Sequence, residues 1–230
     1  MGNVNTLTFC CRLSQSSKRK AEYSILGRHS APSFLPANFL EELILQAKGT
    51  YEKFRKATIE SVYFLNRTAR DKADDVLIPS FDVSSEKNGE IIAWIQETDS
   101  GNFDVYVACE GGVVSGISCA LMFEGCRALK HIDFSYFDTS NAVSMSRMFS
   151  ECESLKQLDL SHFDTSNVKR MSGMFFACRS LEQLNLNHFD TSKVTSMDDM
   201  FCYCYALKKL DLSHFDTSKA EDMGRMFEDC

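Results

Sequence analysis

Residues 155–178 read LKQLDLSHFDTSNVKRMSGMFFAC, and this stretch recurs every 26 residues through the C-terminal half of the chain. Its Phe-Asp-Thr-Ser segment begins at Phe137, Phe163, Phe189 and Phe215, and each copy is followed by a Met-x-x-Met-Phe-x-x-Cys run. A fixed period of this length predicts a solenoid, in which each repeat packs only against its neighbours. Such an array presents an extended surface, so the pattern favours binding over catalysis.

The apolar positions of each repeat predict one short strand and one short helical turn. In the copy that begins at Leu155, Leu158 and Leu160 point inward with the period of two that a strand requires. The two Met residues of each run lie three apart, a spacing that suits one helical turn facing a core. The predicted repeat core contains Phe137, Phe163, Phe189 and Phe215; Met148, Met174, Met200 and Met226; and Cys126, Cys152, Cys178 and Cys204.

Five of the ten cysteines occupy the same position of successive repeats: Cys126, Cys152, Cys178, Cys204 and Cys230. Cysteine is small, apolar and readily buried, so a column of buried thiols is favoured over a chain of disulfides or a ladder of metal ligands. Cys202 and Cys204 are too close in sequence for the usual zinc-binding pair, and no partner pair exists. We therefore expect no metal and no cofactor.

The composition narrows the class of protein. The chain has 230 residues, of which 44% are hydrophobic and 25% charged, as in ordinary globular proteins. Its net charge of −7 argues against a nucleic-acid binder, which would carry a basic stripe. No apolar run approaches the roughly 18 residues of a membrane span. The first residues lack the pattern of a secretory signal.

Three segments are expected. Residues 1–36 are basic and Ser-rich and predict a mobile tail, residues 37–112 predict a helix and β cap, and residues 113–230 hold about four and a half repeats, truncated at the C-terminus. Asn38 and Glu41 have the spacing of a capping box, which predicts a helix over about 38–48 that Gly49 ends. Alternation predicts strands at 58–65, 91–95 and 103–107, the last two joined as a hairpin.

The repeat resembles that of the BspA-like leucine-rich-repeat surface proteins, whose pattern is L-x-x-L-D-L-S-x-F-D-T-S-x-V-x-x-M-x-x-M-F-x-x-C. The resemblance covers residues 113–230 and extends back to about residue 54. It does not include any residue before 50. It implies an α/β fold, a leucine-rich-repeat-like right-handed solenoid of 26-residue repeats with a small N-terminal helix and β-hairpin cap. It also implies a cell-surface or secreted protein that adheres to host, matrix or neighbouring-cell proteins.

The outward strand positions form ladders along the predicted sheet. One contains Asp133, Asp159, Asn185 and Asp211; another contains Ser135, Ser161, Asn187 and Ser213; a third contains Gln157, Gln183 and Lys209, with His131 in the first copy. Strand rungs lie about 4.8 Å apart, so these side chains predict a mildly acidic polar strip. The strip is the candidate binding face for a protein ligand; the alternative is a solvated sheet face without a partner.

No catalytic residue is predicted, and the chain is not expected to be an enzyme. His162, His188 and His214 recur at the period within a Ser-His-x-Asp pattern, or Asn-His-x-Asp in the copy at His188. A catalytic triad is a single constellation in a cleft, whereas these copies are nearly identical. A pH-sensitive stack of histidines remains an alternative, because histidine titrates near neutrality.

The remaining expectations concern covalent modification, the last repeat and the compartment. Met1 to Thr6 fit a myristoylation pattern, Cys10 and Cys11 could carry palmitate, and Asn66-Arg67-Thr68 is a glycosylation sequon. The last repeat has no polar cap, so self-association through this end is expected. Because no signal peptide is visible, a cytoplasmic scaffold or protein–protein interaction module is the alternative to a surface adhesin.

Overall fold

The computed structural model describes residues 34–66, 79–87 and 89–230. The predicted acylation pattern, nearly all of the predicted tail and two of the three sequon residues lie outside these described residues. The elements are α1 (Phe39–Ala47), η2 (Lys56–Thr58), β1 (Ile59–Asn66), β2 (Ser80–Asp82), β3 (Ile92–Glu97), β4 (Phe103–Cys109), β5 (Val113–Val114), β6 (His131–Asp133), β7 (Phe137–Asp138), β8 (Gln157–Leu158) and β9 (Gln183–Leu184).

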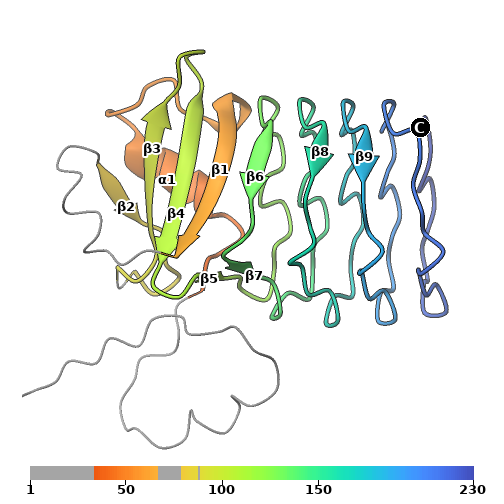
Figure 1. Ribbon diagram of the computed structural model, residues 1–230. Coiled ribbons are helices and arrows are strands. Elements are labelled where there is room, and N and C mark those ends of the chain that lie inside the picture. The colour runs from red at the N-terminus through yellow and green to blue at the C-terminus, as the bar shows by residue number, and fades with distance from the viewer. Residues whose placement is uncertain (1–33, 67–78, 88) are drawn as a thin grey trace, which may run out of the picture.

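The N-terminal block is built on a mixed five-stranded sheet with the order β2-β3-β4-β1-β6. Strand β1 is parallel to β4 and to β6, whereas β3 is antiparallel to β4 and to β2. The edge strand β6 belongs to the first repeat, so the repeats begin directly on this sheet (Figure 1). Residues from both parts contribute to one hydrophobic core.

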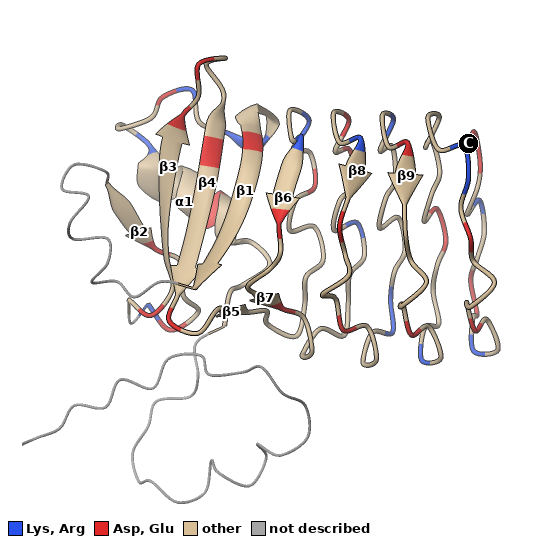
Figure 2. Cartoon of the chain, in the orientation of Figure 1, with Lys and Arg blue, Asp and Glu red and all other residues tan. Residues whose placement is uncertain are grey.

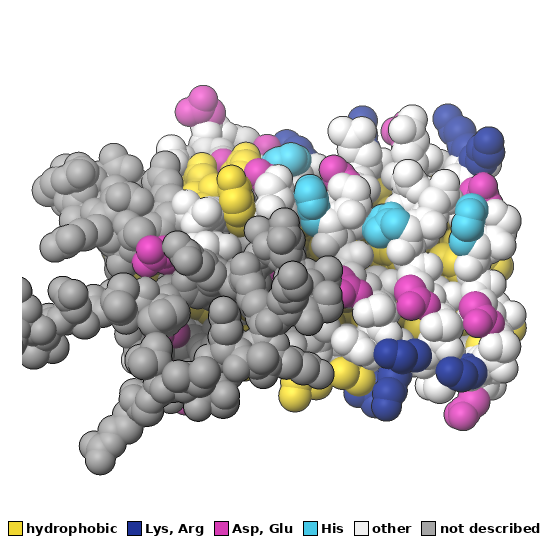
Figure 3. Space-filling view, turned by 60° about the horizontal axis from the view of Figure 1, so that its bottom comes forward, with side chains coloured by type: hydrophobic (Ala, Val, Ile, Leu, Met, Phe, Trp, Pro, Cys, Tyr) yellow, Lys and Arg dark blue, Asp and Glu magenta, His cyan; other side chains and the backbone are white. Residues whose placement is uncertain are grey.

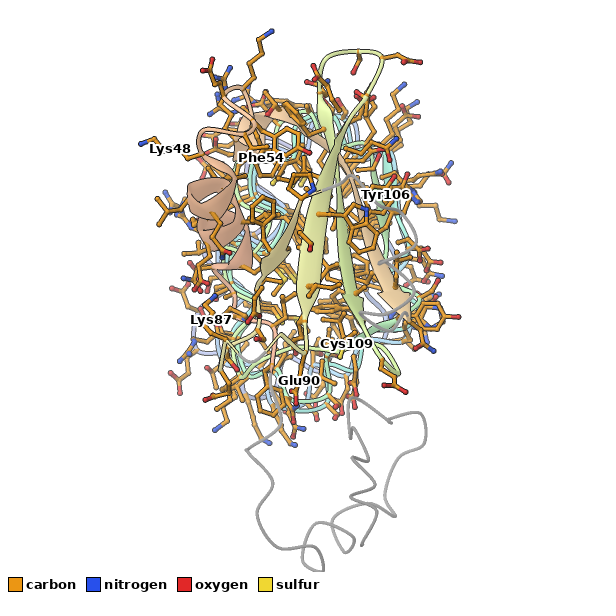
Figure 4. The ribbon with its side chains drawn as sticks, turned by 90° about the vertical axis from the view of Figure 1, so that its left-hand side faces the viewer. Lys48, Phe54, Lys87, Glu90, Tyr106 and Cys109 are labelled. Carbon is orange, nitrogen blue, oxygen red and sulfur yellow. The ribbon has the colours of Figure 1, made fainter. Side chains whose placement is uncertain are left out.

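Helix α1 covers the inner face of the five-stranded sheet. Its buried residues Phe39, Leu40, Leu43 and Ala47 follow helical periodicity. An end-on view places α1 on one side of the sheet and Tyr106 on the other (Figure 4). The predicted helix at 38–48 is confirmed, and Gly49 follows it with φ of 97°. The predicted capping box is wrong, because Asn38 makes no side-chain capping bond.

The predicted strand at 58–65 and the predicted hairpin are confirmed by β1, β3 and β4. The hairpin turn is closed by the N–H of Thr98, which donates to the carbonyl of Asn102 at 2.9 Å, and by the N–H of Gly101, which donates to the carbonyl of Thr98 at 2.9 Å. Gly101 has φ of 75°, a conformation that glycine adopts without steric cost.

Glu60 connects this hairpin to the first repeat. Its carboxylate accepts hydrogen bonds from Lys130 Nζ at 2.6 Å, Ser100 Oγ at 2.5 Å and Asn102 Nδ2 at 3.2 Å. The bond from Lys130, followed by that from Ser100, lowers the pKa of Glu60 to about 2. The ionised form therefore stabilises the folded chain.

Acidification tests the contribution of Glu60. Its folded pKa of about 2 lies below the ordinary 4.5, so its stabilisation is present above about pH 4.5 and is lost as the pH falls towards 2. Glu60→Gln should lose less stability than the wild type between pH 5.5 and pH 2.5, measured by urea unfolding. Glu86→Gln, which changes an exposed glutamate, is the control. Parallel wild-type and Glu60→Gln curves would contradict this role.

The repeats form a row of layers that extends from the N-terminal sheet towards Cys230 (Figure 1). Parallel bridges connect equivalent positions of successive layers: Ser118 with Ser144, Ser144 with Arg170, Arg170 with Ser196, and Ser196 with Asp222. Each layer thus pairs with the layer 26 residues later in the chain. The strands themselves are short, since β8 and β9 contain two residues each.

The predicted fold class, an α/β leucine-rich-repeat-like right-handed solenoid with a strand and a helical turn in each repeat, is wrong. The described residues form small sheets of five, two and two strands, and their one α-helix lies outside the repeats. The Met-x-x-Met-Phe runs are consecutive turns. Arg147 and Glu151 have φ of 55° and 60°, which no right-handed helix contains. The N–H groups of Arg147 and Phe149 donate to the next layer, at Ser172 and Met174, instead of within the run.

The core inside the stacked layers is filled by columns in which successive layers contribute the same side chain. Phe123, Phe149, Phe175, Phe201 and Phe227 stack with ring centroids 5.6–5.7 Å apart and planes within 9° of parallel. The residues predicted for the core, Phe137, Phe163, Phe189, Met148, Met174, Met200 and Met226, are buried, and Phe215 is partly buried.

The cysteine column lies in the same core. The thiols of Cys152, Cys178 and Cys204 donate to the carbonyls of Phe123, Phe149 and Phe175 at 3.3, 3.1 and 3.1 Å. Burial raises the pKa of Cys126 and of Cys204 to about 12, which keeps the thiols protonated. Cys126, Cys152, Cys178 and Cys204 are buried free thiols, as the predicted column requires, and Cys230 at its end is a free, exposed thiol.

The Phe-Asp-Thr-Ser corners join the layers with side-chain hydrogen bonds. Thr165 Oγ1 donates to the carbonyl of Asp190 at 3.1 Å and accepts from the N–H of Asp190 at 2.8 Å. Thr139 and Thr191 make the same pair of bonds to Asp164 and Asp216. The aspartates hold the turn itself, because the N–H of Ser166 donates to Asp164 Oδ1 at 2.9 Å.

Candidate functional site

The outward side of the sheet and of the repeat strands forms one continuous surface, which we call the strand face. Side chains of a strand alternate between its two sides. Val62 and Phe64 of β1 and Val105 and Val107 of β4 are buried in the core, so Tyr63 and Tyr106 point outward. Since β6 is shared by the sheet and the first repeat, the strand face continues from the N-terminal block onto the repeats.

An aromatic row crosses the N-terminal part of the strand face and consists of Trp94, Tyr106, Tyr63 and His131. Trp94 pairs with Tyr106 and Tyr106 with Tyr63, with ring centroids 5.3 and 5.0 Å apart and planes within 14° of parallel. His131 lies 5.6 Å from Tyr63. Trp94, Tyr106 and Tyr63 thus cover the faces of one another, whereas the ring of His131 is tilted by 52° against that of Tyr63. The stacked rings therefore leave little exposed ring face against which the sugar ring of a carbohydrate ligand could stack.

Burial raises the pKa of the Tyr106 hydroxyl, with a further contribution from the neighbouring Asp104. The phenol is therefore neutral and can both donate and accept a hydrogen bond. Tyr63 and Tyr106 are partly exposed, whereas Trp94 is buried. The two tyrosines are consequently the parts of the aromatic row that a partner can reach.

The predicted polar ladders lie next to this row, but the side chains of one ladder already accept hydrogen bonds from the backbone of the chain. Asp133, Asp159, Asn185 and Asp211 each accept a hydrogen bond through Oδ1, at 2.9–3.1 Å, from the N–H two residues later, at Ser135, Ser161, Asn187 and Ser213. Hydrogen bonds from the following serine lower the pKa of Asp133, Asp159 and Asp211. These carboxylates therefore stay ionised, and their first role is to hold a turn.

A shallow groove of about 740 Å³ crosses the beginning of the repeat strands. It is lined by Lys130, Ser154, Lys156, Gln157, Ser180, Glu182 and Gln183, which come from three successive layers. The predicted Gln157 and Gln183 thus lie together in it, whereas Lys209 is exposed outside it. Charged residues mark the beginnings of β6, β8 and β9 (Figure 2).

Sequence reasoning missed several residues of this surface. Lys130, Lys156 and Glu182 line the groove directly before the third predicted ladder, and their common position in the repeat could have revealed them. The alternation that predicted strands at 58–65 and 103–107 also placed Tyr63 and Tyr106 on the side opposite the core. That the two rings are adjacent depends on the pairing of β1 with β4.

Histidines recur along the layers in a row (Figure 3). His162, His188 and His214 are exposed, and His188 Nε2 lies 2.7 Å from the carbonyl of Leu160. After the hydrogen bonds from Ser135 and Ser161, His162 contributes to lowering the pKa of both Asp133 and Asp159. The pH-sensitive stack stays a prediction.

Two further features of the described residues concern metal binding and membrane insertion. In that part of the chain, no group of three or more His, Cys, Asp or Glu residues is placed to hold a metal ion. The described helices also include none that is long and apolar enough to cross a membrane, in agreement with the prediction of no transmembrane segment.

Comparison with protein families gives one match. A family described as Mycoplasma protein of unknown function, DUF285, matches residues 117–230, which begin at the first repeat. Comparison of the chain with curated proteins and with solved structures finds no match.

Proposed function

We propose that this chain is a non-catalytic protein-binding module that acts in adhesion at a cell surface or in secreted form. The observation that carries the proposal is the continuity of the strand face, on which the aromatic row leads into the polar ladders and the groove. The similarity of its repeat to that of BspA-like surface proteins supports an adhesive role.

The chemistry of the strand face suits a protein partner. Tyrosine is enriched among the residues that dominate the binding energy of protein interfaces, and polar groups around such residues supply hydrogen bonds. Seven rungs separated by about 4.8 Å, from β3 to the fourth layer, span roughly 29 Å. That length is compatible with the roughly 800 Å² that each partner buries in a standard interface. The groove can receive a protruding loop of a host, matrix or neighbouring-cell protein.

Binding to intact epithelial cells and to immobilised matrix proteins tests the proposal. The Tyr63→Ala variant should weaken binding at least 10-fold, as expected for an aromatic anchor of an interface. The double variant Gln157→Ala/Gln183→Ala should also weaken binding, because it removes two amide side chains that line the groove. Asn141→Ala, at a Phe-Asp-Thr-Ser corner away from the strand face, is the matched control. A folded protein that binds neither cells nor matrix proteins, or that binds equally well in all variants, would refute the proposal.

A second candidate function is an interaction module inside the cell that uses the same face. The five cysteines of the repeat column are free thiols, which is the usual state in a reducing compartment. Antibody labelling of intact and of permeabilised cells distinguishes the two candidates. Labelling that requires permeabilisation would favour the intracellular module.

A further inference from the structure

The four strand segments and the five turn runs differ in how strongly their copies vary. On the strand face two of the three ladders are nearly constant, as in Asp133, Asp159, Asn185 and Asp211, whereas the third changes from His131 through Gln157 and Gln183 to Lys209. The outward side chains of the Met-x-x-Met-Phe-x-x-Cys runs, and of the residue after each Cys, form the opposite surface, which we call the turn face. Ser150, Gly173 and Cys202 of these runs are buried. At the exposed and partly exposed positions the equivalent residues differ in charge and size: Leu121, Arg147, Asp199 and Arg225; Glu124, Phe176 and Glu228; Arg127, Glu153, Arg179 and Tyr205.

The backbone does not require this variation. Arg147, Asp199 and Arg225 have φ of 55°, 57° and 54°, so different side chains occupy one backbone conformation in successive layers. The core columns beneath them are also constant, because every run supplies the same Phe and Cys. Most differences between the exposed residues of the turn face are therefore not imposed by the backbone or by the core. Gly173 is an exception, because a Cβ there would lie 3.1 Å from Cγ of Arg147.

An aromatic cluster lies on this face across the third and fourth layers. The ring of Phe176 lies 5.5 Å from that of Tyr203 at 83°, and the ring of Tyr203 lies 6.0 Å from that of Tyr205. The guanidinium of Arg147 lies 5.8 Å from the centre of Phe176. The side chain of Tyr205 is 58% exposed, so the cluster is outside the core. Tyrosine and arginine together are typical of the centres of protein interfaces.

Most charges around the cluster are already paired within the turn face. Arg127 contacts Glu151 at 2.7 Å and Glu153 at 3.6 Å. Arg147 contacts Glu124 at 3.6 Å, and Arg225 contacts Asp199 at 2.9 Å. Arg179, one layer before Tyr205 at the same position of the repeat, is exposed and has no ion pair within 4 Å among the described residues. The cation beside the cluster is thus available to an external carboxylate.

The strand face and the turn face lie on opposite sides of the core. Phe134, from the strand side of the first layer, contacts Phe149, from the turn side of the second, with centroids 6.0 Å apart. The turn face continues towards α1 through Lys56 of η2, whose Nζ donates to the carbonyl of Leu121 at 3.2 Å and pairs with Glu41 of α1. A partner on the turn face therefore leaves the strand face free.

We propose that the turn face is a second docking surface, centred on Phe176, Tyr203 and Tyr205, for a protein segment that carries a carboxylate beside an apolar side chain. The carboxylate pairs with the guanidinium of Arg179, whose planar fork matches a carboxylate with two parallel hydrogen bonds. The apolar side chain packs against Tyr205. The exposed residues of the turn face differ from layer to layer. They select the partner through side chains that the ladders of the strand face do not contain.

A displayed library of random 12-residue peptides, selected on the whole chain, tests the proposal. Selected peptides should be enriched in Asp or Glu next to Leu, Ile or Phe. Their affinity should fall at least 10-fold in Arg179→Ala and in Tyr205→Ala. Both residues are exposed, so both variants should fold, which thermal unfolding checks. Arg127→Ala is the matched control, because Arg127 occupies the same position of the repeat two layers earlier and is ion-paired.

A charge reversal sharpens the test. Selection on Arg179→Glu should enrich Lys or Arg next to the apolar residue. The proposal is overturned if the library gives no binder, if basic peptides are enriched on the wild type, or if selected peptides bind Arg179→Ala and Tyr205→Ala as tightly as the control. Loss of peptide binding in Tyr63→Ala instead would assign the peptides to the strand face and equally overturn the proposal.

Discussion

Replacing Phe175 with alanine is expected to lower the free energy of unfolding by about 3–5 kcal/mol, the usual cost of truncating a buried phenylalanine. Its side chain is 0% exposed, and its ring stacks between those of Phe149 and Phe201, each with centroids 5.7 Å away. The variant loses the transfer free energy of the ring and both stacking contacts, and it leaves a cavity between two layers. Urea unfolding followed by circular dichroism measures the loss.

The control for this result is Phe227→Ala. Phe227 occupies the same column, but it is 52% exposed and stacks on Phe201 alone. We expect its replacement to cost clearly less than that of Phe175. Equal losses in the two variants would show that the column does not stabilise the layers through stacking on both sides.

Replacing Thr165 with valine is expected to cost about 1–3 kcal/mol, because it leaves the backbone N–H and C=O of Asp190 without their partner while preserving the shape of the side chain. Thr165 is 2% exposed, and its hydroxyl makes both cross-layer bonds at 2.8–3.1 Å. The loss should appear in urea unfolding. Faster amide hydrogen exchange at Asp190 would locate it at this corner.

Thr217→Val is the matched control for the corner. Thr217 has the same place in its repeat and is exposed, and within the described residues its hydroxyl makes no cross-layer hydrogen bond. The two substitutions are chemically identical, so the difference between them isolates the cross-layer bonds. A loss in Thr217→Val as large as in Thr165→Val would attribute the effect to side-chain propensity instead.

Local signals were sufficient where one element supplies its own pattern. The apolar spacing of Phe39, Leu40 and Leu43 predicted α1, and the alternation around the turn at Gly101 predicted the hairpin. The helical turn predicted in each repeat was wrong, because two methionines three residues apart, such as Met145 and Met148, also suit a hydrogen-bonded turn. The N–H of Met148 donates to the carbonyl of Met145 at 3.2 Å in that turn.

The candidate site was predictable to a similar degree. Equivalent positions of the repeat placed Gln157 and Gln183 on one side, and the groove contains both. The sequence could not show that Asp159 accepts a hydrogen bond from the N–H of Ser161, since aspartate and serine are suited equally well to solvent-exposed positions and to turns. Nor could it place Tyr63 beside Tyr106, which is 43 positions later in the chain.

The sequence alone determined the period, the residues of the core columns and the short elements of the N-terminal block. These depend on residue type and spacing, which act within one repeat or one element. Only the tertiary structure decided how the runs are bonded and which surfaces exist. Residues such as Arg147 and Glu151 adopt positive φ without being glycine because their N–H groups, or those next to them, bond to the following layer. The strand face arises from the pairing of β1 with β4 and β6, and the turn-face cluster from the stacking of one layer on another.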